Sequence, residues 1–176
     1  LEAFLKTKPA PEREADAMYE RGMAEVGLKK FDVAVTTFTS LLTKAPTFPA
    51  TDKVLYELGW ALKSQEKNKE ATPQFAKLAT TFAESPLAPE ANFHVGEDFY
   101  EAKNFEEAVK SYALSKQKAG KTELGEKATY KLGWSFHQLK QFDKAVAEFN
   151  AQVTEYPKGP LAGDGMFMKA EGLFKL

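Results

Sequence analysis

The chain repeats itself with a period of 37 residues along almost its whole length. Glycine recurs at this spacing at positions 22, 59, 96 and 133, and alanine recurs at positions 34, 71, 108 and 145. An aromatic residue stands four positions after each of these alanines, as Phe38, Phe75, Tyr112 and Phe149. Several tracks that share one period predict a tandem repeat protein, in which each repeat buries its apolar face against its neighbours.

Each period contains two helical patterns. Leu55, Leu58 and Leu62 lie at i, i+3 and i+7, and Ala71, Phe75 and Leu78 form a second stripe of the same kind. Proline-rich segments at 45–52, 83–90 and 156–164 separate the periods, and proline ends one helix and opens the next. We therefore predict helices at 14–28, 31–44, 52–65, 68–82, 89–102, 105–118, 125–139, 142–155 and 161–175.

The recurring glycine predicts close helix packing. A glycine inside a helix costs about 1 kcal/mol relative to alanine, so its recurrence indicates a crossing point where bulk is excluded. The recurring alanine of the second helix is expected to face it. In the first repeat, Arg21 and Glu25 stand where later repeats carry apolar residues, which predicts a looser and more solvated first pair.

The repeated residues resemble the tetratricopeptide repeat pattern. The resemblance is clearest in Leu58, Gly59, Leu62, Ala71 and Phe75 and in Leu132, Gly133, Phe136, Ala145, Phe149 and Pro157. The resemblance implies an all-α, right-handed superhelical solenoid of antiparallel helix pairs over residues 1–176. It divides the chain into four full repeats at 15–51, 52–88, 89–125 and 126–162. Residues 1–9 would end a truncated upstream repeat, and residues 163–176 would be the first helix of a truncated fifth repeat.

The loops between repeats are three residues longer than the usual tetratricopeptide period requires. Their sequences, SPLA at 85–88 and GPLA at 159–162, are similar to bacterial envelope-associated members such as the Tol-Pal coordinator and outer-membrane assembly lipoprotein subfamilies. That similarity implies the periplasm or cell envelope, with the cytoplasm as the alternative. The absence of cysteine fits an oxidising compartment and excludes thiolate metal sites and cysteine nucleophiles.

No residue pattern indicates catalysis, a metal or a cofactor. His94 and His137 occupy different positions of the repeat, and Gly120-Lys121-Thr122 lacks the glycine that a phosphate-binding loop needs five residues earlier. The net charge of −1 gives no basic face for nucleic acid, and no apolar run reaches the roughly 18 residues of a membrane span. We therefore expect neither an enzyme nor a nucleic-acid-binding or membrane-inserted protein.

The resemblance also implies where a ligand binds, because the first helix of each pair lines the concave surface in this family. The inward positions are those three residues before each recurring glycine, one residue after it and four residues after it. Together with Glu101, they give the candidate groove residues Tyr19, Met23, Tyr56, Trp60, Lys63, Phe93, Glu97, Tyr100, Glu101, Tyr130, Trp134, His137, Phe167 and Phe174. Lysine and asparagine, which the carboxylate-clamp subset of the family needs, are missing from the matching positions.

Two interpretations of these aromatic residues stay open. The column of Tyr19, Tyr56, Phe93, Tyr130 and Phe167 is also suited to helix packing. Both tryptophans stand at the same repeat position and fit ligand contact, with packing on the neighbouring helix as the alternative.

The predicted function is a non-catalytic scaffold that binds a protein or peptide in an aromatic groove, as part of a larger multi-repeat assembly factor. The acidic residues near Glu97 favour an apolar peptide that carries lysine or arginine. The alternative is a structural spacer or oligomerisation element that acts through its ends. Phe167, Leu173, Phe174 and Leu176 in the last helix predict self-association there.

Overall fold

A computed structural model describes residue 3, residue 7 and residues 10–176. The described residues contain α-helices and no strand, which confirms the all-α class, and every predicted helix is present with its ends within three residues of the prediction. The helices are α2 (Pro11–Gly27), α3 (Phe31–Lys44), α4 (Thr51–Lys63), α5 (Asn68–Thr81), α6 (Ala88–Glu101), α7 (Phe105–Ala119), α8 (Glu123–Gln138), α9 (Phe142–Glu155) and α10 (Ala162–Lys175).

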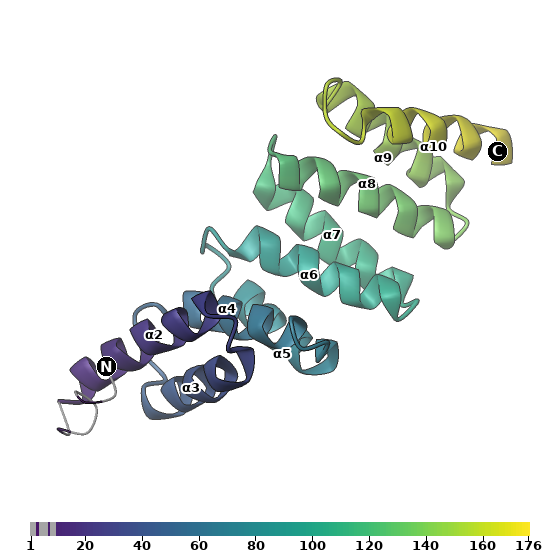
Figure 1. The fold of residues 1–176 in the computed structure, drawn as a ribbon. Helices are drawn as coiled ribbons and strands as arrows, with labels where there is room; N and C mark the ends of the chain where they lie inside the picture. Colours follow the sequence, from purple (N-terminus) through teal and green to yellow (C-terminus); the bar gives the residue numbers. More distant parts are fainter. Residues whose placement is uncertain (1–2, 4–6, 8–9) are drawn as a thin grey trace. The chain divides into compact units, whose positions relative to one another are not determined.

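The chain divides into two compact units, residues 1–87 and residues 88–176. In the first unit, α2 pairs with α3 and α4 pairs with α5, and α3 also packs against α4 (Figure 1). In the second unit, α6 pairs with α7 and α8 pairs with α9, and α10 packs on α9. Both units therefore consist of the antiparallel helix pairs that the sequence predicts.

The core of each unit comes from the apolar stripes of its helices. Phe38, Leu55 and Phe75 are completely buried in the first unit, and Tyr112 and Phe149 are completely buried in the second. Burial of each such side chain stabilises the fold by about 1.5–3 kcal/mol.

The recurring glycines lie against the recurring aromatic rings. A Cβ atom added at Gly59, Gly96 or Gly133 would come within 2.7–2.8 Å of a ring atom of Phe75, Tyr112 or Phe149. Gly22 meets the ring of Phe38 in the same way. The close packing that the recurring glycine predicts is confirmed, and the atoms nearest to each glycine belong to the aromatic ring four residues after the recurring alanine. That the alanine itself faces the glycine stays a prediction.

The two helices of each pair are joined by a turn that repeats with the same period. Lys29, Glu66, Lys103 and Lys140 stand 37 residues apart, and each has a positive φ between 57° and 60°. The residue after each of them donates its backbone N–H to a carbonyl five residues earlier, as Lys67 does to Leu62 at 3.0 Å. This left-handed ending closes a helix and starts the next one after a short turn.

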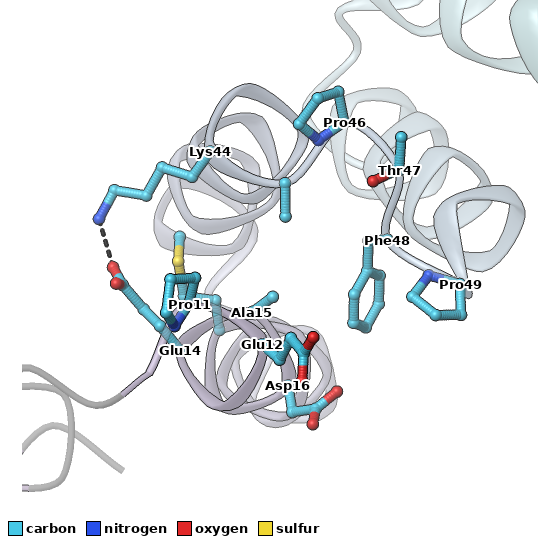
Figure 2. A pocket seen from close by; sticks show the side chains of 12 residues that line it. Pro11, Glu12, Glu14, Ala15, Asp16, Lys44, Pro46, Thr47, Phe48 and Pro49 are labelled. Carbon is cyan, nitrogen blue, oxygen red and sulfur yellow. Dashed lines mark hydrogen bonds and ion pairs between the residues drawn. The ribbon is translucent and has the colours of Figure 1, made fainter.

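The loops that follow the second helices are held in different ways. In the second pair, the Ser85 hydroxyl donates to the Asp52 carboxylate at 2.6 Å, and in the fourth pair the backbone N–H of Leu161 donates to Glu126 at 3.0 Å. In the first pair the loop turns the ring of Phe48 toward α2 (Figure 2). That ring lies 5.6 Å from the ring of Tyr19, centroid to centroid.

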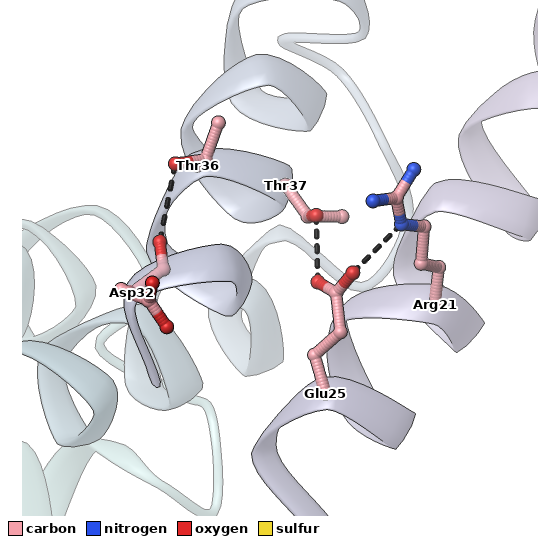
Figure 3. Close-up of polar contacts among 5 residues, drawn as sticks. All are labelled: Arg21, Glu25, Asp32, Thr36 and Thr37. Atoms are coloured by element: carbon pink, nitrogen blue, oxygen red, sulfur yellow. Dashed lines mark hydrogen bonds and ion pairs between the residues drawn. The ribbon is translucent and has the colours of Figure 1, made fainter. Parts of the chain in front are cut away.

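The prediction of a more solvated first pair is wrong at Glu25 but holds at Arg21, whose side chain is 32% exposed while Leu58, Val95 and Leu132 at the same repeat position are buried. Glu25 is only 8% exposed. Its carboxylate accepts a hydrogen bond from the Thr37 hydroxyl at 2.7 Å and another from the Arg21 Nε at 2.7 Å (Figure 3). A buried carboxylate with two strong donors replaces the leucine or phenylalanine of the later repeats and ties α2 to α3.

Two predictions about the repeat boundaries remain predictions. The expected end of an upstream repeat at residues 1–9 lies mostly outside the described residues. The division of the chain into repeats at 15–51, 52–88, 89–125, 126–162 and 163–176 likewise stays a prediction from the sequence.

Candidate functional site

Three of the predicted groove residues line one hollow in the first unit. Tyr19 and Met23 come from α2 and Tyr56 comes from α4, and the hollow has a volume of about 300 Å³. Pro86 and Leu87, in the loop after α5, complete its mainly apolar wall. Two helices and a loop of one unit therefore bring apolar side chains from distant parts of the sequence to one open recess, which we call the α2–α4 hollow.

The α2–α4 hollow has a negative edge. Asp52 and Glu57 line it together with one lysine, Lys53. Burial raises the pKa of Glu57 above its ordinary value of 4.5, and Glu57 has no hydrogen bond or ion pair within residues 10–176. Burial also raises the pKa of the Tyr19 phenol, and the charges of Glu57, Glu20 and Asp52 raise it further. A cationic group placed beside the apolar wall would relieve this concentration of negative charge.

Trp60 and Lys63 lie farther along α4 and do not line the α2–α4 hollow. The Trp60 side chain is 37% exposed, and its ring lies edge-on to Tyr56 at 6.4 Å between centroids. Lys63 is partly buried. The structure therefore places Trp60 next to the hollow, through Tyr56, and not inside it.

In the second unit, two members of the aromatic column pack onto the core. Phe93 of α6 lies 5.5 Å from the ring of Tyr112, and Tyr130 of α8 lies 5.8 Å from the ring of Phe149. Both residues are only partly buried, so each keeps an open edge. These contacts favour the packing interpretation for Phe93 and Tyr130, whereas Phe167, another member of the column in this unit, is 68% exposed.

Trp134 also packs inside the second unit. It lies against the buried cluster of Ala145, Phe149 and Met168, with its ring 6.4 Å from that of Phe149. Met168 belongs to α10, so the contact joins one helix pair to the next helix. For this tryptophan, the structure favours packing on the neighbouring helix over ligand contact.

The acidic residue Glu97 is engaged by its neighbours. Lys131 Nζ lies 2.7 Å from its carboxylate, and the Tyr112 hydroxyl donates to the same oxygen at 3.1 Å. Burial, followed by the charge of Glu97, raises the pKa of Tyr112 far above its ordinary value. Lys131 also lies 5.7 Å from the ring centre of Tyr100, whose hydroxyl accepts a hydrogen bond from Gln138 at 3.4 Å. In this polar network Tyr112 is completely buried and Glu97, Tyr100 and Lys131 are partly buried, whereas Gln138 and the nearby Glu101 are exposed.

His137 is held between aromatic rings. Its ring lies 5.6 Å from Trp134 and 5.2 Å from Phe142, and its Nε2 atom lies 3.7 Å from the carboxylate of Glu171. Phe167 and Phe174, by contrast, are 68% and 89% exposed on α10. The structure therefore does not bring the phenylalanines of α10 together with the other groove residues.

Sequence comparison agrees with this architecture. Two family models described as tetratricopeptide repeat match the chain, one at residues 56–122 and the other at residues 16–47 and 127–159. Together they cover well over half of the sequence. The chain belongs to the tetratricopeptide repeat family. No curated protein is significantly similar to it.

Solved tetratricopeptide-like structures share the fold. MamA from residue 41 to its end, from Desulfovibrio magneticus RS-1, is 16% identical with a TM-score of 0.65, over 83% of this chain and 77% of that one. A tetratricopeptide repeat protein from Parabacteroides merdae ATCC 43184 is 17% identical with a TM-score of 0.78, over 92% of this chain and 61% of that one. At these identities the likeness shows the fold alone.

Tetratricopeptide repeat proteins generally bind other proteins and act as non-catalytic scaffolds. Within residues 10–176 no three histidine, aspartate or glutamate side chains gather in a way that could hold a metal ion. Among the helices of that range, none combines the length and the apolar character that crossing a bilayer requires.

The tetratricopeptide pattern alone does not identify five residues of the α2–α4 hollow. Asp52, Lys53 and Glu57 lie on α4 outside the three inward columns, and Pro86 and Leu87 belong to a loop. No periodicity in the sequence relates this loop to α2, so no signal there identifies Pro86 and Leu87. Lys131 was missed for a similar reason, since only its distance to Glu97 gives it a role.

Proposed function

We propose that this tetratricopeptide protein is a scaffold that binds a protein or peptide through the aromatic side of its first helices, without catalysing a reaction. The observation that carries the proposal is the α2–α4 hollow. Three predicted groove residues, Tyr19, Met23 and Tyr56, line one apolar recess with a negative edge. A recess of this kind is a typical place for a single anchoring side chain of a ligand.

The chemistry of the α2–α4 hollow favours a ligand in which an apolar side chain stands next to a basic one. The wall formed by Met23, Tyr56 and Leu87 suits an aliphatic or aromatic group, while Asp52 and Glu57 favour a neighbouring lysine or arginine. The helices are already packed before binding, so the ligand meets a rigid surface and little ordering cost is added. In the second unit, the open edges of Phe93 and Tyr130 and the exposed Glu101 offer further contacts.

The wider context is also part of the proposal. The 37-residue period and the SPLA and GPLA loops support a relationship with bacterial envelope members such as the Tol-Pal coordinator and outer-membrane assembly lipoprotein subfamilies. We infer that the chain is one section of a larger multi-repeat assembly factor of the periplasm or cell envelope. The absence of cysteine supports this location over the cytoplasm.

A second candidate function rests on α10. Met166, Phe167, Leu173 and Phe174 of this helix, and Leu176 directly after it, are each more than half exposed. Large apolar side chains grouped in this way mark a surface that is covered by another helix or molecule. The alternative function is therefore a spacer or oligomerisation element whose end makes the contacts and whose α2–α4 hollow stays free.

The experiment that separates the two candidates is a pull-down from envelope extract with matched variants. Met23→Ala with Tyr56→Ala removes the wall of the hollow, and Leu28→Ala removes an apolar side chain that is 67% exposed elsewhere in the same unit. Trp134→Ala is unsuitable, because Trp134 packs on the core of the second unit.

We expect a partner that the wild type and Leu28→Ala retain and that the double variant loses. The double variant should keep the helicity of the wild type and should still unfold cooperatively. Equal retention by all three proteins would contradict binding at the hollow. If the partner is lost instead from a Phe167→Ser, Phe174→Ser variant, the spacer function is correct.

A further inference from the structure

A second and larger hollow lies at the open end of the first helix pair. It has a volume of about 710 Å³, which lies within the range of pockets that bind ligands. Pro11 and Met18 of α2 line it together with Lys44 of α3 and with Phe48 and Pro49 of the following loop (Figure 2). We call it the end hollow. It is distinct from the α2–α4 hollow, with which it shares no lining residue.

At the end hollow, the first pair lacks a carboxylate that two later pairs have. One repeat period after Ala15 stands Asp52, and three periods after it stands Glu126. Those two carboxylates reach the loop after the second helix of their pair and accept hydrogen bonds from Ser85 and from the Leu161 N–H. The methyl group of Ala15 has no such reach, and the loop of the first pair is not tied to α2 at this point.

The loop residue at the matching place differs as well. Gly159 in the fourth pair lies so close to Glu126 that a Cβ atom would collide with its carboxylate. Phe48 stands in the same repeat position of the first pair, three periods earlier, and its ring stacks near Tyr19. In the fourth pair, Glu126 and Gly159 lie together and close this end of the pair. In the first pair, Ala15 and Phe48 stand at these two positions, and the end is open.

The end hollow has an apolar floor and an acidic rim. Ala15, Met18 and Ala45 contribute the floor. Of the charged groups around it, Lys44 is paired with Glu14 at 2.5 Å, whereas Glu12 and Asp16 have no hydrogen bond or ion pair within residues 10–176. Figure 2 shows these two side chains next to each other on α2. Two unpaired negative charges beside an apolar floor complement an apolar side chain next to a cation.

We propose that the end hollow binds a segment of a partner protein in which an aliphatic or aromatic side chain adjoins lysine or arginine. The apolar side chain lies on Ala15, Met18 and Ala45, and the cation pairs with Glu12 and Asp16. This is a binding site in addition to the aromatic side of the scaffold, and it does not depend on the α2–α4 hollow.

The methionines make the proposal directly measurable. The chain has four, and Met18 lines the end hollow while Met23 lines the α2–α4 hollow. Met166 and Met168 lie on α10 and serve as internal controls. The NMR signals of isotope-labelled methionine methyl groups in the full chain would be followed while the peptide GLFKKG, or its acidic counterpart GLFEEG, is added to millimolar concentration.

The matched variant reverses the rim charges. Glu12→Lys with Asp16→Lys changes two exposed side chains, so the helix pair is expected to fold normally. We expect GLFKKG to shift the Met18 signal, GLFEEG to leave it in place, and the double variant to weaken the response to GLFKKG by about tenfold.

Three results would overturn the proposal. The Met18 signal could stay unchanged with GLFKKG, which includes the case in which another part of this chain already fills the end hollow. It could shift equally with both peptides, or shift undiminished in the double variant. A response confined to Met23 would overturn this site and leave the proposed function standing, so the two proposals fail separately.

Discussion

Gly59→Ala tests the packing that every helix pair shares. The added Cβ would lie 2.7–2.9 Å from three ring atoms of Phe75, a side chain with no exposed surface. Overpacking of this kind costs about 1–3 kcal/mol, and the upper part of that range is expected because the rigid ring has no free space to move into. The better helix propensity of alanine returns about 1 kcal/mol. The net loss in the free energy of unfolding is therefore about 2 kcal/mol.

Gly27→Ala is the matched control in the same unit. Nothing lies within 4 Å of a Cβ atom at Gly27, the last residue of α2, so this change is expected to be neutral or slightly stabilising. Urea unfolding followed by far-ultraviolet circular dichroism measures both variants. Hydrogen exchange of α4 and α5 then shows whether the loss is confined to the first unit, which matters because two compact units need not unfold together.

A Phe75→Leu change, combined with Gly59→Ala, should restore part of the stability that Gly59→Ala loses. It removes the ring that the added methyl would meet, so the double variant should be more stable than the sum of the two single losses predicts, by about 0.5–3 kcal/mol. If Gly59→Ala is as stable as wild type, or if the two changes are simply additive, the reasoning about the glycine–aromatic contact is refuted.

Three further predictions follow from single contacts. Thr37→Val removes a buried donor from Glu25 and should cost about 1.5 kcal/mol in urea unfolding, with Thr36→Val, on the exposed side of α3, as a neutral control. Glu66→Gly should raise the free energy of unfolding by about 0.5 kcal/mol, because Glu66 holds a φ of 60° that glycine adopts without strain. Glu57→Gln should raise the melting temperature at neutral pH, and this advantage should vanish well below pH 4.5. The sign follows from the raised pKa of Glu57, because ionisation of this group destabilises the fold as the pH rises above the ordinary value of 4.5, and the full effect is present above its folded-state pKa.

The helices could be predicted from the sequence because each one carries its own signal. Glycine, alanine and an aromatic residue mark the same places in each helix pair, and proline marks most of the boundaries. These local patterns decide where a helix begins and ends without information from distant residues. The left-handed turn residues also repeat with the period, but lysine and glutamate do not reveal a positive φ in the way that glycine would.

The candidate site could be predicted only in part, because contacts between helices decide which side chains stay open. Trp60 and Trp134 share one repeat position, yet Trp134 packs on Met168, which lies in the next helix pair. Glu25 looked solvated because its partner Thr37 lies in another helix. The α2–α4 hollow depends on Leu87, a loop residue that no periodicity relates to α2.

Photo-crosslinking from the α2–α4 hollow tests the central claim most directly. A photoreactive phenylalanine replaces Met23, which lines the hollow, or as a control Lys77, an exposed residue of α5 outside it, in the full chain mixed with envelope extract. The account predicts a covalent adduct with a partner protein from position 23 and none from position 77. Adducts of equal yield from both positions, or an adduct only from an equivalent probe at Phe174 of α10, would contradict it.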